Sequence, residues 1–347
     1  MIESQKPGRP GVASSTRSLP AVAAMAVLLL LAPGRATASG AADSLTTASG
    51  SAAPAAPWPA PRLAGYVQAR EIAQEQVGLT AFLNRARFSI DGALPSRFSY
   101  RVLVEMQASA GVRLPATVSL REAIVRWSPA PFTLTAGEFK TPFTREYLIP
   151  VPALELADLA TVVDSLAPRY DVGVMGEYAY GALAVVSLGV FNGEGANAVA
   201  NRDSTVLLVG RVTSRPIPQL ALGGSATHDG PDSLRWGVDA SLQQSGVVVR
   251  SEYITRHLHG RARGDDDFGW YVLESFRATP RLQLVARQED FQRPAGGLAR
   301  RIRGLAYATN LEIAPNRVRL LLEFSRRITG AKQTRTDAFI AQLQVQF

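Results

Sequence analysis

From residue 65 onward, apolar and polar residues alternate along the chain with a period of two. The last segment shows the pattern well, because Phe339 and Leu343 share one phase while Gln342 and Gln344 occupy the other. Successive side chains of a β-strand point to opposite faces. The spacing therefore predicts strands that each carry one apolar and one polar face.

Sixteen such runs follow one another. They lie near residues 65–71, 79–93, 97–108, 118–128, 132–140, 171–179, 182–191, 204–215, 220–228, 235–244, 247–257, 268–278, 282–291, 301–313, 317–328 and 336–347. Every second connector is very short and rich in turn residues, as at Tyr180-Gly181 and Ser245-Gly246, and the intervening connectors are longer and polar. Short turns at one end and long loops at the other are typical of membrane barrels. The sequence therefore predicts an all-β fold, a transmembrane, antiparallel, up-and-down β-barrel of sixteen strands.

Bilayer energetics explain why the two faces differ. Hydrocarbon offers no hydrogen-bond partners, so a membrane-spanning sheet must close on itself. Sixteen strands leave an aqueous channel, which holds charged side chains at little cost. The strand phase predicts pore-lining arginines, each of which could instead form a salt bridge along the wall: Arg85, Arg87, Arg101, Arg126, Arg211, Arg250, Arg287 and Arg319. The direction of Lys140 stays open, because a bulge at Gly137 would change the phase.

The longest connector, residues 141–170, is the third long loop. Apolar residues within 154–166 are spaced as in a short amphipathic helix, whose apolar face needs a wall to pack on. We therefore expect this loop to fold into the lumen, and an outer surface loop is the alternative. The loop is net acidic, and Glu155, Asp158 and Asp164 are its predicted constriction residues. Acids opposite the arginines of strands two to four would produce a transverse field and only a modest preference for anions.

The N-terminal region differs from the rest of the chain. Basic residues precede an apolar run at residues 19–31, and small residues around Ala38 offer a cleavage site. Pro20 and Pro33 bound the run too closely for a membrane anchor, which is the alternative. The sequence predicts a signal peptide at 1–38, a flexible lead-in rich in Ala, Pro and Ser at 39–63, and the barrel at 64–347.

Composition excludes several classes of protein. The chain has no cysteine, which excludes disulfides, thiolate metal sites and thiol catalysis. Its formal charge of +8 is scattered rather than clustered, so nucleic acid is not expected as a partner. Two of its three histidines, His257 and His259, fall in one predicted loop, and no catalytic triad can be assembled. The sequence thus predicts neither an enzyme nor a metal or other cofactor.

Several short segments resemble the phosphate-selective porin O and P family, and the resemblance covers residues 65–347. They are Gly65-Tyr66-Val67-Gln68, Asn84-Arg85-Ala86-Arg87-Phe88, Gly137-Glu138-Phe139-Lys140-Thr141-Pro142-Phe143 and Phe191-Asn192-Gly193-Glu194-Gly195. This resemblance implies a homotrimeric outer-membrane channel that favours anions. Phe347 resembles the terminal aromatic residue by which the barrel-assembly machinery recognises such proteins. The expected partners are therefore that machinery, outer-membrane lipid, lipopolysaccharide and small permeating anions or solutes.

Three functions compete at this point. The favoured hypothesis is an outer-membrane porin, a water-filled channel for passive diffusion of small hydrophilic solutes and ions. The second is a structural or adhesive barrel with an occluded lumen. An outer-membrane hydrolase is disfavoured, because no catalytic set is found at the barrel lip.

Overall fold

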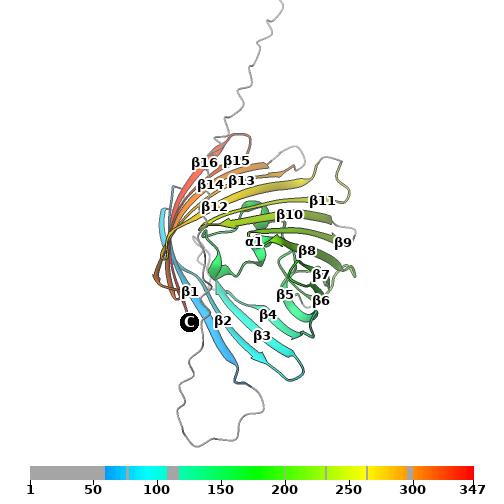
Figure 1. Cartoon of the computed structure of the whole chain (residues 1–347). Coiled ribbons are helices and arrows are strands. Elements are labelled where there is room, and N and C mark those ends of the chain that lie inside the picture. The colour runs from blue at the N-terminus through cyan, green and yellow to red at the C-terminus, as the bar shows by residue number, and fades with distance from the viewer. Residues whose placement is uncertain are drawn as a thin grey trace, which may run out of the picture. The chain divides into compact units, whose positions relative to one another are not determined.

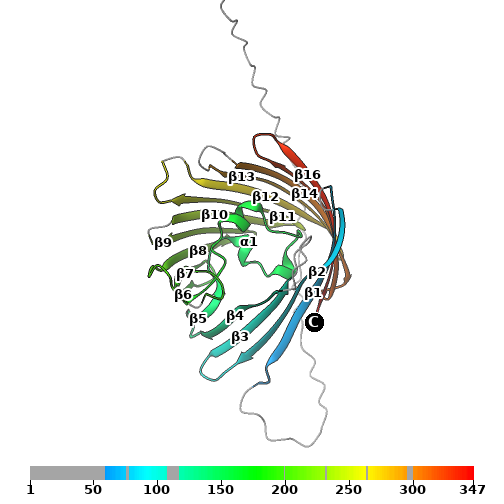
Figure 2. The same ribbon diagram turned by 180° about the vertical axis from the view of Figure 1, so that it is seen from behind.

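The computed structural model describes residues 59–75, 78–107, 117–198, 200–230, 233–262, 265–294 and 300–347. The predicted signal peptide and nearly all of the lead-in lie outside these residues. The described part forms a barrel of sixteen strands (Figures 1 and 2). The strands are β1 (Arg62–Gln74), β2 (Gly78–Ala93), β3 (Phe98–Gln107), β4 (Thr117–Trp127), β5 (Phe132–Lys140), β6 (Tyr170–Tyr180), β7 (Ala184–Phe191), β8 (Leu207–Ile217), β9 (Leu220–Asp229), β10 (Ser233–Gln244), β11 (Val247–Leu258), β12 (Asp267–Thr279), β13 (Leu282–Arg293), β14 (Arg300–Ala314), β15 (Val318–Thr329) and β16 (Thr334–Gln346).

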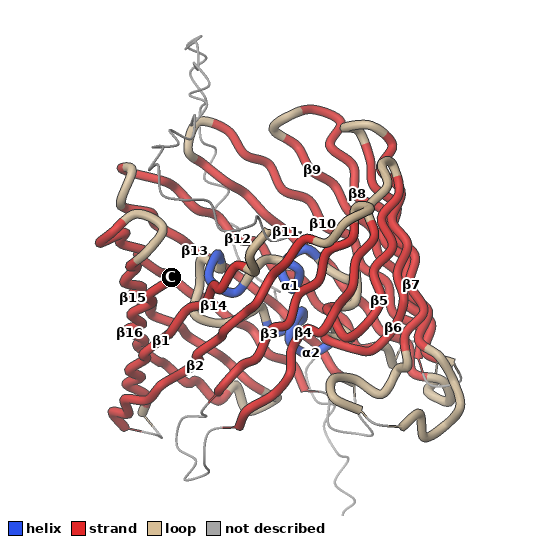
Figure 3. The backbone as a smooth tube through the Cα atoms, turned by 90° about the horizontal axis from the view of Figure 1, so that it is seen from below, coloured by secondary structure: helices blue, strands red, loops and turns tan. Residues whose placement is uncertain are grey.

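The barrel is closed and antiparallel throughout. Each strand pairs with the next one along the chain, and β1 pairs with β16 from Tyr66 opposite Gln346 to Gln74 opposite Ala338. Figure 3 shows that the strands that form the barrel wall run obliquely. The prediction of a sixteen-stranded, up-and-down barrel is confirmed.

The predicted alternation of short and long connectors holds only in part. One end of the barrel has short turns throughout, such as residues 245–246 between β10 and β11. At the opposite end, residues 75–77, 230–232 and 330–333 are also short connectors. Here the expectation of long loops is wrong, because these strands continue further toward the rim than the apolar alternation indicates.

The two faces of the wall carry the expected side chains. Outward positions are exposed and apolar, for example Leu79, Leu188 and Phe339. Inward positions hold polar side chains that bond across strands, as in the pair Gln68 and Gln344, whose amides lie 2.8 Å apart. The outer face suits hydrocarbon, and the inner face suits a water-filled interior.

Two β-bulges change the phase of the wall near the N-terminus. The register of β1 against β2 shifts between Gln68 and Ala69, and Phe82 consequently pairs with the inward Arg70. Strict alternation counted back from Phe88 predicts that Phe82 faces lipid, and this prediction is wrong because the bulge turns Phe82 inward. The register of β3 against β4 shifts between Leu103 and Val104, which leaves Arg121 as an extra residue in β4.

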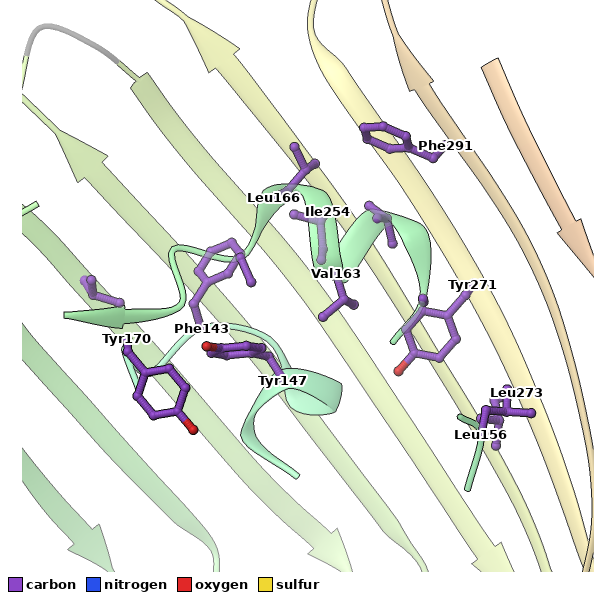
Figure 4. Close-up of a cluster of buried hydrophobic side chains, with 14 of the residues drawn as sticks. Phe143, Tyr147, Leu156, Val163, Leu166, Tyr170, Ile254, Tyr271, Leu273 and Phe291 are labelled. Atoms are coloured by element: carbon purple, nitrogen blue, oxygen red, sulfur yellow. The ribbon is translucent and has the colours of Figure 1, made fainter. Parts of the chain in front are cut away.

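Residues 141–169, which we call loop 3, form the connector that lies inside the barrel. Loop 3 contains α1 (Arg145–Leu148), η1 (Val151–Ala153) and α2 (Thr161–Leu166), so the predicted helix is shorter than the apolar spacing indicated. Figure 4 shows Phe143, Val163 and Leu166 beside Ile254 and Tyr271 of the wall. The apolar core of this hollow fold lies where the loop meets β11, β12 and β13. None of the described helices has the length and apolarity needed to cross a membrane.

Gly137 is a position where the wall tolerates no side chain. Its φ is +126°, and a Cβ there would lie 1.9 Å from the carbonyl oxygen of Ala123. We expect Gly137→Ala to lower the free energy of unfolding by about 2–3 kcal/mol, through strain and displacement of β4. Guanidinium titration of the protein folded in lipid vesicles measures this.

Gly176→Ala is the matched control on the adjacent strand β6. An added Cβ at Gly176 meets no atom within 4 Å. We expect a change within about 0.5 kcal/mol there. Equal effects of the two substitutions would show that the close approach at Gly137 does not constrain the wall.

Candidate pore constriction

Three buried glutamates of the wall bind the backbone of loop 3. Glu252 on β11 accepts hydrogen bonds from the N–H of Arg145 at 2.9 Å and of Glu146 at 2.5 Å. Glu289 on β13 accepts from the N–H of Thr161 at 2.9 Å, and Glu323 on β15 accepts from the N–H of Ala157 at 2.8 Å. Carboxylates that accept from backbone N–H groups form strong, charge-assisted bonds. The loop is thus fixed to one side of the barrel along its length.

Wall arginines bind the acidic side chains of the same loop. Arg250 lies 2.7 Å from Glu155, and Arg70 lies 3.0 Å from Asp158. Arg287 lies 3.4 Å from Glu146 and also donates to the carbonyl of Asp158 at 2.9 Å. Burial raises the pKa of Glu146, and the charge of Arg287 acts in the opposite direction. Most of the negative charge of loop 3 is therefore paired with the wall that the loop covers.

Four predicted pore-lining residues and one predicted constriction residue do not face the open part of the interior. Arg211, Arg287 and Arg319 are 5–8% exposed, and the side chain of Arg250 is 13% exposed. All four point inward but are covered, and Arg211 shares Asp239 with Arg145 of the loop. Glu155 also turns away from the basic side of the barrel, and accepts from Ser275 at 3.1 Å and Gln283 at 3.2 Å.

The uncovered side of the interior carries a cluster that we call the basic wall, made of Arg85, Arg87, Arg121 and Lys140. Glu105, which is fully buried, lies 3.0 Å from Arg85, 2.5 Å from Arg87 and 2.6 Å from Arg121. One carboxylate thus serves three guanidinium groups. The sequence pattern missed Arg121, because it occupies the alternate phase and reaches the lumen through the bulge.

Lys140 completes the basic wall at the end of β5. Its Nζ donates to the carbonyl of Tyr147 and, at 3.2 Å, to that of Ile149, so its direction is toward the lumen and loop 3. Tyr170, the first residue of β6, accepts from Arg87 at 3.5 Å. These contacts bring β2, β5, β6 and loop 3 close together at one level of the barrel.

Two cavities lie on either side of this level. A cavity of about 650 Å³ faces the short turns and Phe347, and a cavity of about 510 Å³ faces the loops. Arg87, Lys140, Val151 and Tyr170 line both of them. The level between the cavities, which we call the passage, is therefore bounded by Arg87 and Lys140 of the basic wall on one side and by Val151 of η1 on the other.

The remaining predicted residues line one of the two cavities, except Arg126. Arg101 is 3.0 Å from Glu122 and lines the cavity at the turn end, whereas Arg126 donates to Thr135 at 3.3 Å outside both cavities. Asp158 and Asp164 line the cavity at the loop end, and Asp164 is 2.6 Å from Arg169. Within the residues that the structure describes, no group of three acidic or histidine side chains is placed to hold a metal ion.

Phe347 closes the sheet at the turn end. It exchanges two backbone hydrogen bonds of 3.0 Å with Gly65, and its ring lies 5.8 Å from that of Phe88. The ring therefore lies beside the outward apolar position Phe88 of β2, and Phe347 continues the apolar phase of Phe339 and Leu343.

Comparisons with known proteins also indicate an outer-membrane barrel of the porin type. Residues 70–232, just under half of the chain, match the family model of phosphate-selective porin O and P. The barrel is also similar to solved outer-membrane channels. The chain therefore has the fold of outer-membrane porins and, over residues 70–232, is similar to this family.

Three solved structures illustrate how closely the fold of the porin is shared. OmpT of Vibrio cholerae has a TM-score of 0.61 at 12% identity, with 83% of this chain and 97% of that chain covered. The outer-membrane channel DcaP of Acinetobacter baumannii gives 0.62 at 10% identity over 83% and 97%. An anion-selective porin from Comamonas acidovorans gives 0.59 at 10% identity over 83% and 99%. A search of curated proteins gives no match.

Removing the inner part of loop 3 tests its role in the porin. Deletion of residues 154–166 removes α2 and the anchors at Glu155, Ala157 and Thr161. We expect a larger single-channel conductance in a planar bilayer, because the passage widens. The barrel should still shift in mobility on heating before electrophoresis. An unchanged conductance would mean that loop 3 does not limit the current.

Proposed function

We propose that the porin is a passive diffusion channel for small hydrophilic solutes and that it favours anions. The observation that carries the proposal is the separation of charge at the constriction. Arg87 and Lys140 face the passage, and Arg85 and Arg121 face the adjoining cavity at the loop end. The three arginines share one buried carboxylate, whereas the carboxylates of Glu146 and Glu155 bind the opposite wall.

The charges along both cavities support this preference. Among described residues, the cavity at the turn end is lined by Arg62, Arg87, Arg101, Lys140 and Arg317 against Glu122, which gives 5 − 1 = +4. The cavity at the loop end is lined by six basic and three acidic residues, which gives 6 − 3 = +3. Fields from one sign of charge in a confined channel raise the local concentration of the opposite ion.

The same contacts argue against tight binding of phosphate. Arg87 and Arg121 direct their Nε atoms to Glu105, and Lys140 donates to two loop carbonyls. Removing phosphate from water is costly unless several free donors converge on it. Here Glu105 competes for those donors. We therefore propose a general preference for anions over selection of phosphate.

Its relatives support the finer points of the proposal. The family is named for phosphate selectivity, and the Comamonas acidovorans porin is described as anion-selective. OmpT of Vibrio cholerae is recorded in a trimer form, which supports a homotrimer here. A trimer would leave part of each outer wall in contact with outer-membrane lipid and lipopolysaccharide.

Export and assembly belong to the same proposal. A signal peptide at 1–38 would direct the chain across the inner membrane. Phe347, at the end of β16 with its ring against Phe88, would serve as the signal that the barrel-assembly machinery reads.

A structural barrel with an occluded lumen is the second candidate. The interior instead holds one cavity on each side of the constriction, and four residues line both cavities. This arrangement favours a channel.

Selectivity is tested by removing charge from the basic wall. The double variant Arg87→Gln, Arg121→Gln leaves Glu105 with Arg85 alone. In a salt gradient across a planar bilayer, we expect the ratio of anion to cation permeability to fall by about twofold or more. The preference of the wild type should also weaken from 0.1 M to 1 M salt, because the Debye length falls from about 10 Å to about 3 Å.

Arg281→Gln, in the exposed turn between β12 and β13, is the matched control and should leave the reversal potential unchanged. A cation-selective wild type, or equal shifts in both variants, would contradict the proposal.

Phosphate is tested directly as a blocker. We expect chloride current through the wild type to persist in micromolar phosphate, because Glu105 already occupies the arginine donors. Block at micromolar concentration would instead show that the basic wall forms a phosphate site.

A further inference from the structure

Four arginines of β14, β15 and β16 face outward from the barrel. Arg301 and Arg303 share the phase of Tyr307, which is 54% exposed on the outer face. Arg326 shares the phase of Phe324, and its guanidinium lies 5.6 Å from the centre of that ring. Arg335 shares the phase of Phe339, which is 61% exposed. We call these four residues the outer arginine patch.

The patch lies at the loop end of the barrel. Arg301 and Arg303 begin β14, Arg326 lies near the end of β15, and Arg335 begins β16. Loop 3 joins its strands at the same end, and the short turns are at the other. Because the long loops of outer-membrane barrels face outside the cell, the patch lies near the outer surface of the membrane.

The charge of the patch is only partly compensated. Asp337 lies 2.9 Å from Arg326 and also binds Arg335, and Asp290 binds Arg301. Arg303 is exposed, and no ion pair joins it to the described residues. Glu75 also lies close enough for its charge to act on Arg335. Four arginines against Asp290, Asp337 and Glu75 leave a formal charge of 4 − 3 = +1. The remaining positive charge, with Arg303 unpaired among the described residues, favours a negatively charged group from outside the barrel wall.

An apolar groove lies beside the patch on the same outer face. Its cavity of about 540 Å³ is lined by Tyr307, Leu322, Phe324, Phe339 and Ala341, and it extends to Leu79 on β2. The rings of Phe324 and Phe339 lie 4.9 Å apart at its edge toward the patch. Glu71 also lines the groove, on β1 opposite Ala341. A groove of this lining accepts a hydrocarbon chain, with its charged end held at the arginines.

We propose that this face binds a phosphorylated glycolipid of the outer leaflet, lipopolysaccharide, through its lipid A part. The phosphate groups bind the outer arginine patch, and one acyl chain lies in the groove between β14 and β1. The proposal rests on the outer-membrane contact proposed above and assigns it a site. A solute of the pore cannot use these residues, because they lie on the opposite face of the wall from the lumen.

Native mass spectrometry of the detergent-solubilised porin with added lipid A tests the site. We expect lipid A with its two phosphates to bind more tightly than dephosphorylated lipid A. The double variant Arg303→Gln, Arg326→Gln should weaken binding by about 25-fold, since each arginine near an anionic headgroup contributes about fivefold. Ala341→Phe, which fills the groove without changing charge, should weaken both lipids.

Arg327→Gln is the matched control, since Arg327 follows Arg326 directly but lines the lumen. It should leave lipid A binding unchanged. The reversal potential of the Arg303→Gln, Arg326→Gln variant should equal that of the wild type. A failure of the lipid A proposal can therefore be distinguished from a failure of the selectivity proposal. If folding of the double variant is impaired on heat-shift gels, the single variant Arg303→Gln should still show about a fivefold loss.

Two results would overturn the proposal. One is equal binding of lipid A by the wild type and the patch variants, or equal binding of the phosphorylated and dephosphorylated lipids. The other is a loss of oligomers in the same spectra without a loss of lipid, which would assign the face to contact between copies of the chain.

Discussion

The organisation of the pore depends on hydrogen bonds from the backbone of loop 3 to buried carboxylates of the barrel wall. Glu252, Glu289 and Glu323 lie on alternate strands, and each accepts from loop N–H groups that would otherwise need water. The packing of α2 on β11 and β13 adds buried apolar contacts to these bonds. Together they fix a long connector against one side of a hollow barrel.

Fixing the loop also sorts the charges of the interior. Arginines of the covered side, such as Arg250 and Arg287, neutralise loop acids and are themselves buried. On the uncovered side, Glu105 cannot neutralise Arg85, Arg87 and Arg121 together. The chain therefore uses similar inward arginines for two purposes, structural pairing under the loop and an electropositive surface along the passage.

The alternation of apolar and polar residues was enough to predict the strand number and the closed sheet, because one face of each strand meets lipid and the other meets water. The apolar spacing within the longest connector was enough to predict the inward loop. The same rule could not separate Arg87, on the passage, from Arg287, under the loop, because both occupy the inward phase. It also missed Arg121 and misplaced Phe82, since a bulge changes the phase without a clear signature in composition. Which side the loop covers is decided by long-range bonds such as that of Glu155 to Arg250.

The position of loop 3 is tested most directly by chemical labelling, since the chain has no cysteine of its own. Val151→Cys places a thiol at the passage, and Ser275→Cys places one beneath the loop beside Glu155. The structure predicts that a negatively charged thiosulfonate reagent reduces the current rapidly through Val151→Cys, and faster than a positively charged reagent, while Ser275→Cys does not react. Rapid labelling of Ser275→Cys, or faster reaction of the positive reagent at Val151→Cys, would contradict this account of the pore.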